Sequence, residues 1–566
     1  MKKNNSQRKQ NFVLGALLLM ISGIICKLIG AFFKVPLTNM IGDAGMGYFS
    51  SAYSIYTVLF TISTAGIPVA VSRIISAYIV KKDKSAVTKT YRASLIILVA
   101  LGLAGFLAMY IYAPSLAKNF LKNEGAVYSI KALAPTLFFI CVESALRGYF
   151  QGHQNMTPTA VSQVIESVGK LAFGIIGALY AMNKGYGIEI VSAFAIIGIC
   201  IGAALSCVYL VVSKLSYRKY DYGIAPADLK SPSTKKILSE IALIAIPITL
   251  SSLVLSIANL VDSTVIMRCL QNSGLTLESA TALIANNENY VLQAMSESQI
   301  IEAASNVIYG NYTSLAVTMY NLPLVLLTPL SISIIPVLSE AFTKNDKTKI
   351  NEVTDSAFRI QSAVSLPCAL GLCALSYPAL CVLYKSAPAQ MAAPLLSILS
   401  ISIFFVAMVS VTNAMLQSLH KQWLPIVSMS VGVAFKFISA YVLISIPEIG
   451  IYGAPISTLL CYFTAMMVNF FFMAKYTKCV PGIRRVFLKP FIASALCALS
   501  AMGSYYLLKL IMGEGRIITL LSIVFAAVVF FFTLFLIGAL TKTDILLLPK
   551  GEKIYTLLLK LKIVKE

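Results

Sequence analysis

Apolar stretches of about 20 residues or more recur along the whole chain, and they constrain its fold more than any other feature. An α-helix needs about 20 apolar residues to cross a hydrocarbon core of roughly 30 Å. Hydrophobic residues make up 58% of the chain and charged residues only 12%. The alternation of apolar and polar residues that is typical of strands is absent. We therefore predict an all-α integral membrane protein.

The sequence predicts about fourteen membrane-spanning helices. The first six cover 12–33, 48–79, 93–113, 130–150, 158–182 and 188–213. The next six cover 239–268, 303–338, 357–384, 391–416, 423–446 and 451–474, and two additional helices cover 490–511 and 517–540. We expect five regions: a lobe at 1–213, a basic cytoplasmic connector at 214–238, a lobe at 239–474 with an outer loop at 269–302, the two additional helices within 475–540, and a basic amphipathic tail at 541–566.

The two sets of six helices carry matching landmarks. The only two histidines, His153 and His420, each stand five residues before a proline in a short polar break, and they lie 267 residues apart. The tripeptide IPV occurs at 67–69 and again at 335–337, an offset of 268. These offsets indicate a tandem repeat of a six-helix unit. Because six is an even number, the copies have the same orientation in the membrane, as in two-lobed transporters.

The distribution of Lys and Arg predicts the orientation. Starting with the N-terminus inside, the cytoplasmic segments collect 32 of the 45 Lys and Arg residues, and the outer loops hold seven. This asymmetry satisfies the positive-inside rule and places both termini in the cytoplasm. It also explains most of the net charge of +22, so no nucleic-acid partner is needed.

Metal and enzyme chemistry are both disfavoured. The eleven cysteines are scattered without a Cys-x-x-Cys pair, and with only two histidines a metal site is not expected. The long outer loop at 269–302 has four Glu but no Asp, His or Arg. An enzyme acting at the outer face would need paired carboxylates or a His and Arg set there, so we do not expect an enzyme.

Ionisable residues inside predicted helices are costly at membrane depth and mark candidate functional positions. On the first helix, Lys27 and Lys34 are two turns apart and share one face, with Gly30 between them. On the second helix, Arg73 follows the helix-breaking sequence GIP, and a kink there would aim its side chain inward. Each has a simpler alternative, because Lys34 could snorkel to the outer surface and Arg73 could anchor a cytoplasmic helix end.

Two acid and base pairs occur in the middle of the first copy. Glu143 and Arg147 are four residues apart on the fourth predicted helix, and Glu166 and Lys170 have the same spacing on the fifth. Residues at this spacing are neighbours on one helix face. We therefore expect two structural ion pairs that help to hold the bundle together, with a coupling role as the alternative.

The second copy has fewer buried charges. Lys436 has no acidic neighbour within one helical turn, and Asp262 is the only carboxylate deep in the spans of this copy. Asp262 is therefore a candidate partner for Lys436 or for a coupling cation, and Arg268 lies near the outer end of the same helix. Taken together, the buried cations outweigh the buried acids, which favours an anionic substrate such as a phosphate or pyrophosphate.

Three segments of the first copy carry a family resemblance. They are RGYFQGHQNMTPTAVSQVIE at 147–166, GIPVAVSR at 66–73, and KLIG at 27–30 followed by GDAG at 42–45. With these motifs the chain resembles the stage V sporulation protein B and polysaccharide exporter branch of the MOP flippase superfamily, which includes the MurJ-type lipid II flippases. The resemblance covers essentially the full length.

The resemblance implies a flippase in the cytoplasmic membrane of a bacterium. It would move an undecaprenyl-pyrophosphate-linked saccharide, such as a lipid II-like peptidoglycan precursor, to the outer leaflet by alternating access, as a monomer and without a cofactor. Lys27 and Arg73, and Lys34 with a shift of about one residue, match the family positions that engage the pyrophosphate in a central cavity, and Asp262 matches the family acid of helix seven.

Two departures from the family pattern and several alternatives stay open. No Lys or Arg stands early in helix eight, where the lipid II flippases have one, and Arg268 is the candidate substitute. Helix eleven presents Lys436 where some members bind sodium, so sodium or proton coupling is undecided. The alternatives are an exporter of another lipid-linked polysaccharide unit, a multidrug or organic cation antiporter of the same superfamily, and a non-transporting scaffold.

Overall fold

The computed structural model describes residues 12–217, 232–285, 295–344, 346–419, 421–478, 481–482 and 484–539. All regular elements in these residues are helical, and no strand occurs among them, which confirms the predicted all-α class. His420, the tail at 541–566 and most of the connector at 214–238 lie outside the described residues.

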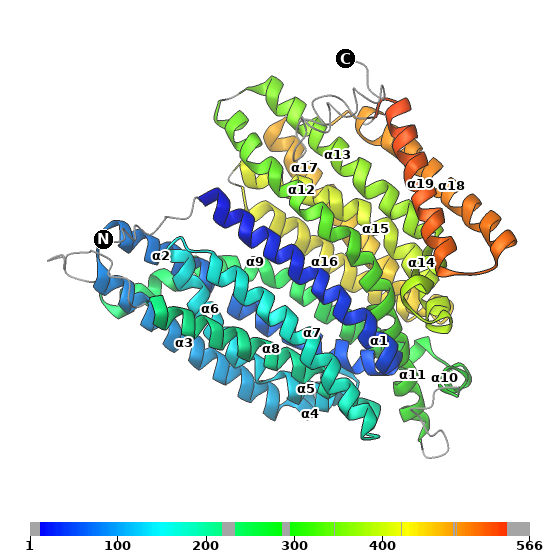
Figure 1. The fold of residues 1–566 in the computed structure, drawn as a ribbon, viewed down its shortest axis with the longest axis horizontal. Helices are drawn as coiled ribbons and strands as arrows, with labels where there is room; N and C mark the ends of the chain where they lie inside the picture. Colours follow the sequence, from blue (N-terminus) through cyan, green and yellow to red (C-terminus); the bar gives the residue numbers. More distant parts are fainter. Residues whose placement is uncertain are drawn as a thin grey trace, which may run out of the picture. The chain divides into compact units, whose positions relative to one another are not determined.

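The chain forms two compact units, and the first ends at Gly310. Its helices are drawn from dark blue to green in Figure 1. They are α1 (Phe12–Thr64), α2 (Ile67–Val80), α3 (Lys84–Ile111), α4 (Ala113–Ser115), α5 (Ala126–Leu133), α6 (Thr136–Gly152), α7 (Thr157–Asn183), α8 (Ile188–Tyr217), α9 (Thr234–Cys269), α10 (Leu277–Ile284) and α11 (Glu297–Asn311).

The second unit begins at Asn311. Its helices are α12 (Val317–Thr343), α13 (Lys347–Ala374), α14 (Ser376–Leu383), α15 (Ser386–Ser418), α16 (Trp423–Ile444), α17 (Gly453–Thr477), α18 (Lys489–Met512) and α19 (Arg516–Leu536). The last two helices pack on each other, and α18 also packs on α13.

Twelve helices of the described residues are long and apolar enough to cross a membrane. The first of them, Leu18–Val80, covers two of the predicted spans, so the number agrees approximately with the predicted fourteen. The protein is therefore a multi-pass membrane protein. The segment at 269–302, which we predicted as an outer loop, contains α10 and the first residues of α11, and its outer position stays a prediction.

The compact division does not coincide with the sequence repeat. The repeat places α9 at the start of the second lobe, but α9 belongs to the first unit and packs against α1 and α2. Two hydroxyl pairs join α9 to α1: Ser54 and Ser263 are 2.8 Å apart, and Thr61 and Ser256 are 2.6 Å apart. Hydroxyl pairs of this kind join neighbouring helices where water is absent.

The helix α11 is tied to the first unit by a buried amide. The Nδ2 atom of Asn306 donates to the carbonyl oxygen of Ala44 at 2.9 Å, and its Oδ1 accepts from Nδ2 of Asn123 at 2.8 Å. Asn306 is fully buried, so both the oxygen and the nitrogen of its side-chain amide need partners inside the protein. This contact holds α11 against the middle of α1.

The first two predicted spans form one element that is bent at a glycine. The chain stays helical on both sides of Gly42, where φ is 65° and ψ is −176°. Residues 34–41, which we predicted as part of a loop, therefore continue the first helix. The predicted break at GIP is confirmed, because α1 ends at Thr64 and α2 starts at Ile67. Only glycine adopts the Gly42 conformation without strain, so this residue sets the direction of the second half of α1.

Replacement of Gly42 by Ala tests this account of the bend. A Cβ at Gly42 would meet no atom within 4 Å, so the whole effect comes from the backbone conformation. We expect Gly42→Ala to lower the free energy of unfolding by about 1–3 kcal/mol, measured by denaturant titration of the purified protein. Gly23→Ala is the matched control, because Gly23 also has open space but lies within helical backbone. Equal stability of the two variants would contradict the account.

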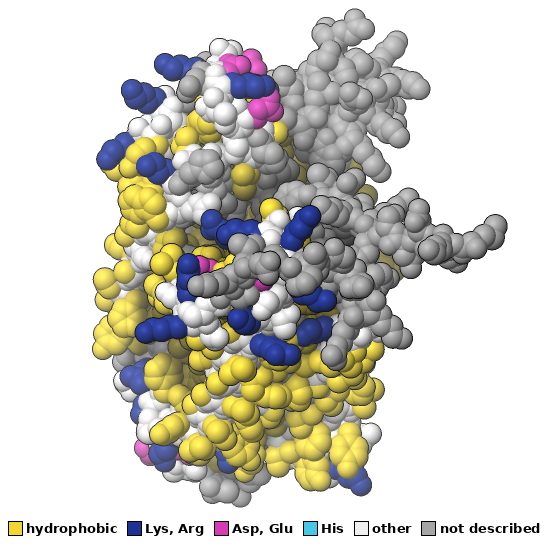
Figure 2. Space-filling model, turned by 90° about the vertical axis from the view of Figure 1, so that its left-hand side faces the viewer, with side chains coloured by type: hydrophobic (Ala, Val, Ile, Leu, Met, Phe, Trp, Pro, Cys, Tyr) yellow, Lys and Arg dark blue, Asp and Glu magenta, His cyan; other side chains and the backbone are white. Residues whose placement is uncertain are grey.

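Exposed lysines gather at the turn between α2 and α3. Lys81, Lys82 and Lys84 are all exposed there, and Asp83 between them caps α3 by accepting a hydrogen bond from the backbone N–H of Ala86. Figure 2 shows one face of the molecule on which Lys and Arg side chains gather among apolar ones, with few acids. The cytoplasmic position of this turn stays a prediction.

Candidate functional site

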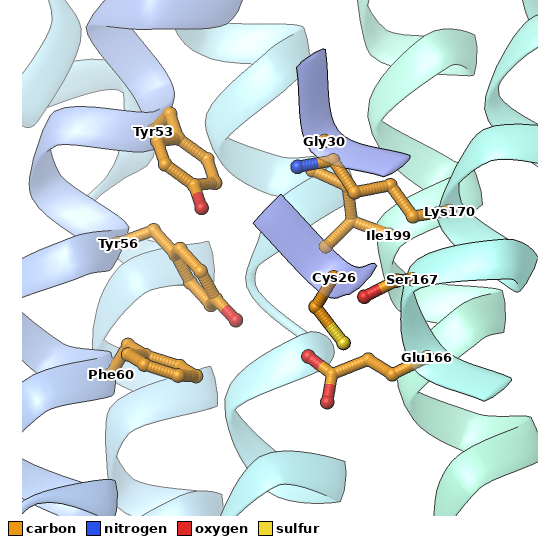
Figure 3. Close-up of a pocket in the computed structure, with 9 residues that line it drawn as sticks. All are labelled: Cys26, Gly30, Tyr53, Tyr56, Phe60, Glu166, Ser167, Lys170 and Ile199. Atoms are coloured by element: carbon orange, nitrogen blue, oxygen red, sulfur yellow. The ribbon is translucent and has the colours of Figure 1, made fainter. Parts of the chain in front are cut away.

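A cavity of about 170 Å³ lies inside the first unit, between α1, α7 and α8 (Figure 3). Both halves of α1 contribute to its wall, because the bend at Gly42 turns the second half back toward the first. The lining residues are Cys26, Gly30, Tyr53, Tyr56 and Phe60 from α1, Glu166, Ser167 and Lys170 from α7, and Ile199 from α8.

The close approach of α7 and α8 positions the polar wall of the cavity. A Cβ on Gly169 would lie 2.7 Å from the Cα atom of Gly202 on α8, which no real side chain tolerates. A Cβ on Gly202 would in turn meet the carbonyl oxygen of Glu166 and the backbone nitrogen of Lys170. Small residues at such crossings let membrane helices pack backbone to backbone. Gly202 therefore allows α8 to pack against the turn of α7 that carries Glu166 and Lys170, the two ionisable residues of the cavity.

Polar groups from two sides face the cavity. In Figure 3 the hydroxyl groups of Tyr53 and Tyr56 point from α1 toward the wall formed by Ser167, Glu166 and Lys170. The ammonium group of Lys170 also lies between two aromatic rings, 5.0 Å from the centre of the Phe33 ring and 5.2 Å from that of Tyr53. Cation–π contacts of this kind stabilise a lysine inside the membrane region.

Arg147 on α6 joins two carboxylates beside the cavity. One of its terminal nitrogens lies 2.8 Å from Glu143, which is fully buried, and 2.9 Å from Glu166 on α7. Its Nε also donates to Ser162 at 3.1 Å. The predicted pair of Glu143 and Arg147 is therefore confirmed as an ion pair.

The second predicted pair is wrong. No ion pair joins Glu166 to Lys170 within the described part of the chain, because Glu166 bonds to Arg147 across the helix interface and Lys170 packs on aromatic rings. Spacing along one helix could not reveal an arginine from a neighbouring helix. The arginine links α6 to α7 and fixes the Glu166 carboxylate at the cavity wall.

The two lysines of α1 lie on the same helix as Gly30, which lines the cavity. Lys27 and Lys34 stand three residues before and four residues after Gly30, which lines the cavity, so all three share one side of the helix. Lys27 is exposed and Lys34 is half-buried. Lys34 lies within electrostatic range of Lys170, which lines the cavity.

The other predicted site residues are not part of this cavity. Arg73 on α2 is exposed. Arg268 donates from its guanidinium to the carbonyl oxygen of Asn119 at 3.0 Å, which ties the end of α9 to the segment after α4. Asp262 is half-buried on α9, within electrostatic range of Tyr309. Lys436 is buried on α16 in the second unit, so its pairing with Asp262 of the first unit stays a prediction.

Sequence reasoning missed the aromatic side of the cavity. The side chains of Phe49, Tyr53, Tyr56 and Phe60 form a row with ring centres 5.6–5.9 Å apart along the second half of α1. Their spacing of four, three and four residues places them on one helix face. This spacing was visible in the sequence, but it is also typical of ordinary core packing.

Comparison with known proteins identifies the family. Residues 12–342, more than half of the chain, match the family described as polysaccharide biosynthesis protein. The chain belongs to this family. Its motifs at 27–30, 42–45, 66–73 and 147–166 all lie within the matched region, so the resemblance drawn from the sequence is confirmed.

Two proteins with similar sequences come from Bacillus subtilis (strain 168). Lipid II flippase MurJ is 25% identical over 82% of this chain and 82% of that protein. Stage V sporulation protein B is 24% identical over 79% of this chain and 81% of that protein.

Two solved structures share the fold. Lipid II flippase MurJ in an inward closed conformation matches with a TM-score of 0.65 and 16% identity, covering 91% of this chain and 98% of that chain. A multidrug resistance MATE family transporter of the MOP superfamily, in an inward-facing conformation, matches with a TM-score of 0.64 and 16% identity, covering 82% and 98%. This family member therefore has the MOP superfamily fold.

Proposed function

We propose that this protein is a flippase for a lipid-linked saccharide that carries a pyrophosphate, such as a lipid II-like precursor, and that it moves this lipid from the inner to the outer leaflet. The observation that carries the proposal is the charge distribution around the cavity of the first unit. Lys27 and Lys34 flank the cavity-lining Gly30 on α1, and Lys34 lies within electrostatic range of Lys170.

The balance of charges favours an anionic ligand. The carboxylates Glu143 and Glu166 are matched by Arg147, which contacts both, and by Lys170 four residues along α7. Lys27 and Lys34 add two further positive charges on α1, on the side of the helix that carries Gly30. An excess of positive charge inside a membrane region is costly unless an anion neutralises it. A pyrophosphate supplies the matching charge and several acceptor oxygens for ammonium donors.

The organic cation antiporter is less well supported, although a multidrug transporter shares the fold. A cation site needs a carboxylate that is free to face its ligand, whereas Glu166 is held by Arg147 at 2.9 Å. We expect that expression of the protein leaves the resistance of cells to cationic dyes unchanged, as measured by growth at graded dye concentrations. A several-fold gain in resistance that depends on Glu166 would favour the antiporter instead.

Externalisation in cells tests the proposed flippase. Cells that lack other flippases for the same precursor are supplied with labelled precursor, and an impermeant enzyme that cleaves only outer-leaflet lipid reports its export. We expect the wild-type protein to restore labelling of the outer leaflet. Absence of any labelling by a folded, membrane-inserted protein would overturn the proposal for that precursor. The same assay with a different lipid-linked polysaccharide unit distinguishes an exporter of a lipid II-like precursor from an exporter of another lipid-linked polysaccharide.

A further inference from the structure

We infer that the cavity between α1, α7 and α8 is a saccharide subsite, which receives one sugar ring of the lipid-linked substrate while the pyrophosphate stays at the mouth with Lys27 and Lys34. The inference rests on the proposed function, because it names the part of that substrate that the cavity holds. Four observations support it: the cavity's size, its polar groups, its charge balance and its position beside the two lysines.

The size of the cavity suits a part of a ligand. At about 170 Å³ it has room for roughly five water molecules. Pockets that hold a whole small-molecule ligand are larger, about 300–1,000 Å³. A lipid-linked saccharide therefore fits this space only with one of its units, either a sugar ring or a phosphate group.

The polar groups of the cavity match the hydroxyl pattern of a sugar. Tyr53, Tyr56 and Ser167 offer hydroxyl groups that both donate and accept, Lys170 donates, and Glu166 accepts. The hydroxyls of a sugar ring likewise donate and accept, so each finds a partner among these groups. A phosphate group only accepts hydrogen bonds at its ionised oxygens, so the hydroxyl groups of Tyr53, Tyr56 and Ser167 would serve it only as donors.

The charge balance inside the cavity points the same way. Glu166 and Lys170 are the two charged residues that line the cavity, and their formal charges cancel. The neighbouring Glu143 and Arg147 also cancel, at a distance of 2.8 Å. A neutral wall that includes a carboxylate disfavours a multiply charged anion and accepts a neutral ring. Lys27 and Lys34 of α1 are not among the residues that line the cavity.

The covalent order of the substrate agrees with this arrangement. In a lipid-linked saccharide the first sugar is bonded directly to the pyrophosphate. On α1 the cavity-lining Gly30 lies between Lys27 and Lys34, so an anion held by either lysine places the attached ring at the cavity mouth. Gly30 also leaves open space, because a Cβ there would meet no atom within 4 Å. The open space at Gly30 is the entrance for the ring.

Binding of two matched lipids to the purified full-length protein tests the inference. The probes are a short-chain polyprenyl pyrophosphate and the same lipid carrying one N-acetylhexosamine. We expect the wild-type protein to bind the glycosylated lipid about tenfold more tightly, because several hydroxyl contacts of the ring add to those of the pyrophosphate. We expect Tyr53→Phe, Tyr56→Phe and Ser167→Ala each to lower the affinity for the glycosylated lipid about fivefold and to leave the affinity for the bare lipid unchanged.

Two further variants make the result decisive. Gly30→Leu fills the entrance and should abolish the preference for the glycosylated lipid, whereas Gly23→Leu, where a side chain also meets open space away from the cavity lining, should keep it. Tyr128→Phe, an exposed tyrosine on α5, controls for loss of a hydroxyl elsewhere. Thermal unfolding of every variant identifies those that do not fold.

The outcomes separate the subsite from the proposed function. Equal affinity of the wild-type protein for both lipids, or equal losses for both lipids in the cavity variants, would overturn the saccharide subsite and leave the flippase proposal standing. Failure of the wild-type protein to bind either lipid would count against the proposed function itself. A preference for the glycosylated lipid that disappears only in the cavity variants supports the subsite.

Discussion

Arg147→Met is expected to destabilise the first unit strongly. The guanidinium group contacts Glu143 at 2.8 Å and Glu166 at 2.9 Å, and Glu143 is fully buried. Removal of one partner from a buried ion pair leaves an uncompensated charge and costs about 3–5 kcal/mol. We expect a loss of this size in the free energy of unfolding, measured by denaturant titration in detergent micelles, together with loss of export.

A triple variant separates the charge effect from loss of packing. Arg147→Met combined with Glu143→Gln and Glu166→Gln removes all three charges and keeps side chains of similar size. We expect it to recover most of the stability, because a buried ion cluster replaced by neutral groups of similar volume is often no less stable. Arg147→Lys should recover only part, because a lysine lacks the Nε–H group that donates to Ser162. Wild-type stability of Arg147→Met alone would contradict this role.

Lys34→Gln is expected to weaken binding of the pyrophosphate with little effect on folding. Lys34 lies four residues after the cavity-lining Gly30 and within electrostatic range of Lys170, so its removal relieves repulsion in the empty protein and takes a cation from the proposed site. A hydrogen bond to a charged group contributes about 1.5–3 kcal/mol, which corresponds to a loss of about tenfold to a hundredfold in affinity for a polyprenyl pyrophosphate. Direct binding titration of the purified variant measures this loss.

Lys89→Gln is the matched control for this substitution. Lys89 is exposed on α3 and lies outside the cavity lining, so its loss removes the same charge from the protein without touching the site. We expect its affinity to equal that of the wild-type protein within about twofold. Equal losses in both variants would mean that overall charge, and not the position of Lys34, determines binding.

The fold class and the family followed from the sequence because both depend on patterns along one chain. An apolar run that is long enough to cross a membrane forms a helix whichever helices pack beside it. The motifs at 66–73 and 147–166 are each one continuous stretch of sequence, so they can be recognised without the structure. The ion pair of Glu143 and Arg147 was also predictable, because one turn of a single helix brings the two groups together.

The candidate site was less predictable because it is assembled from separate helices. The bond from Arg147 to Glu166 crosses from α6 to α7, and Lys170 packs on rings of both halves of α1. Helical spacing carries no information on such contacts. The positive φ at Gly42 turns α1 back on itself and creates the cavity, and a glycine in an apolar run gives no sign of its conformation. Grouping of α9 with the first unit likewise depends on tertiary contacts.

Transport in vesicles of defined composition tests the central claim most directly. Three proteins are reconstituted with a fluorescent polyprenyl-pyrophosphate saccharide: the wild-type protein, the double variant Lys27→Gln and Lys34→Gln, and the control variant Lys89→Gln. An impermeant quencher reports how much of the lipid reaches the opposite leaflet. We predict rapid transfer by the wild-type protein and by Lys89→Gln, and transfer no faster than in protein-free vesicles by the double variant. Transfer by the double variant at the wild-type rate would contradict the claim that the cations of α1 hold the pyrophosphate.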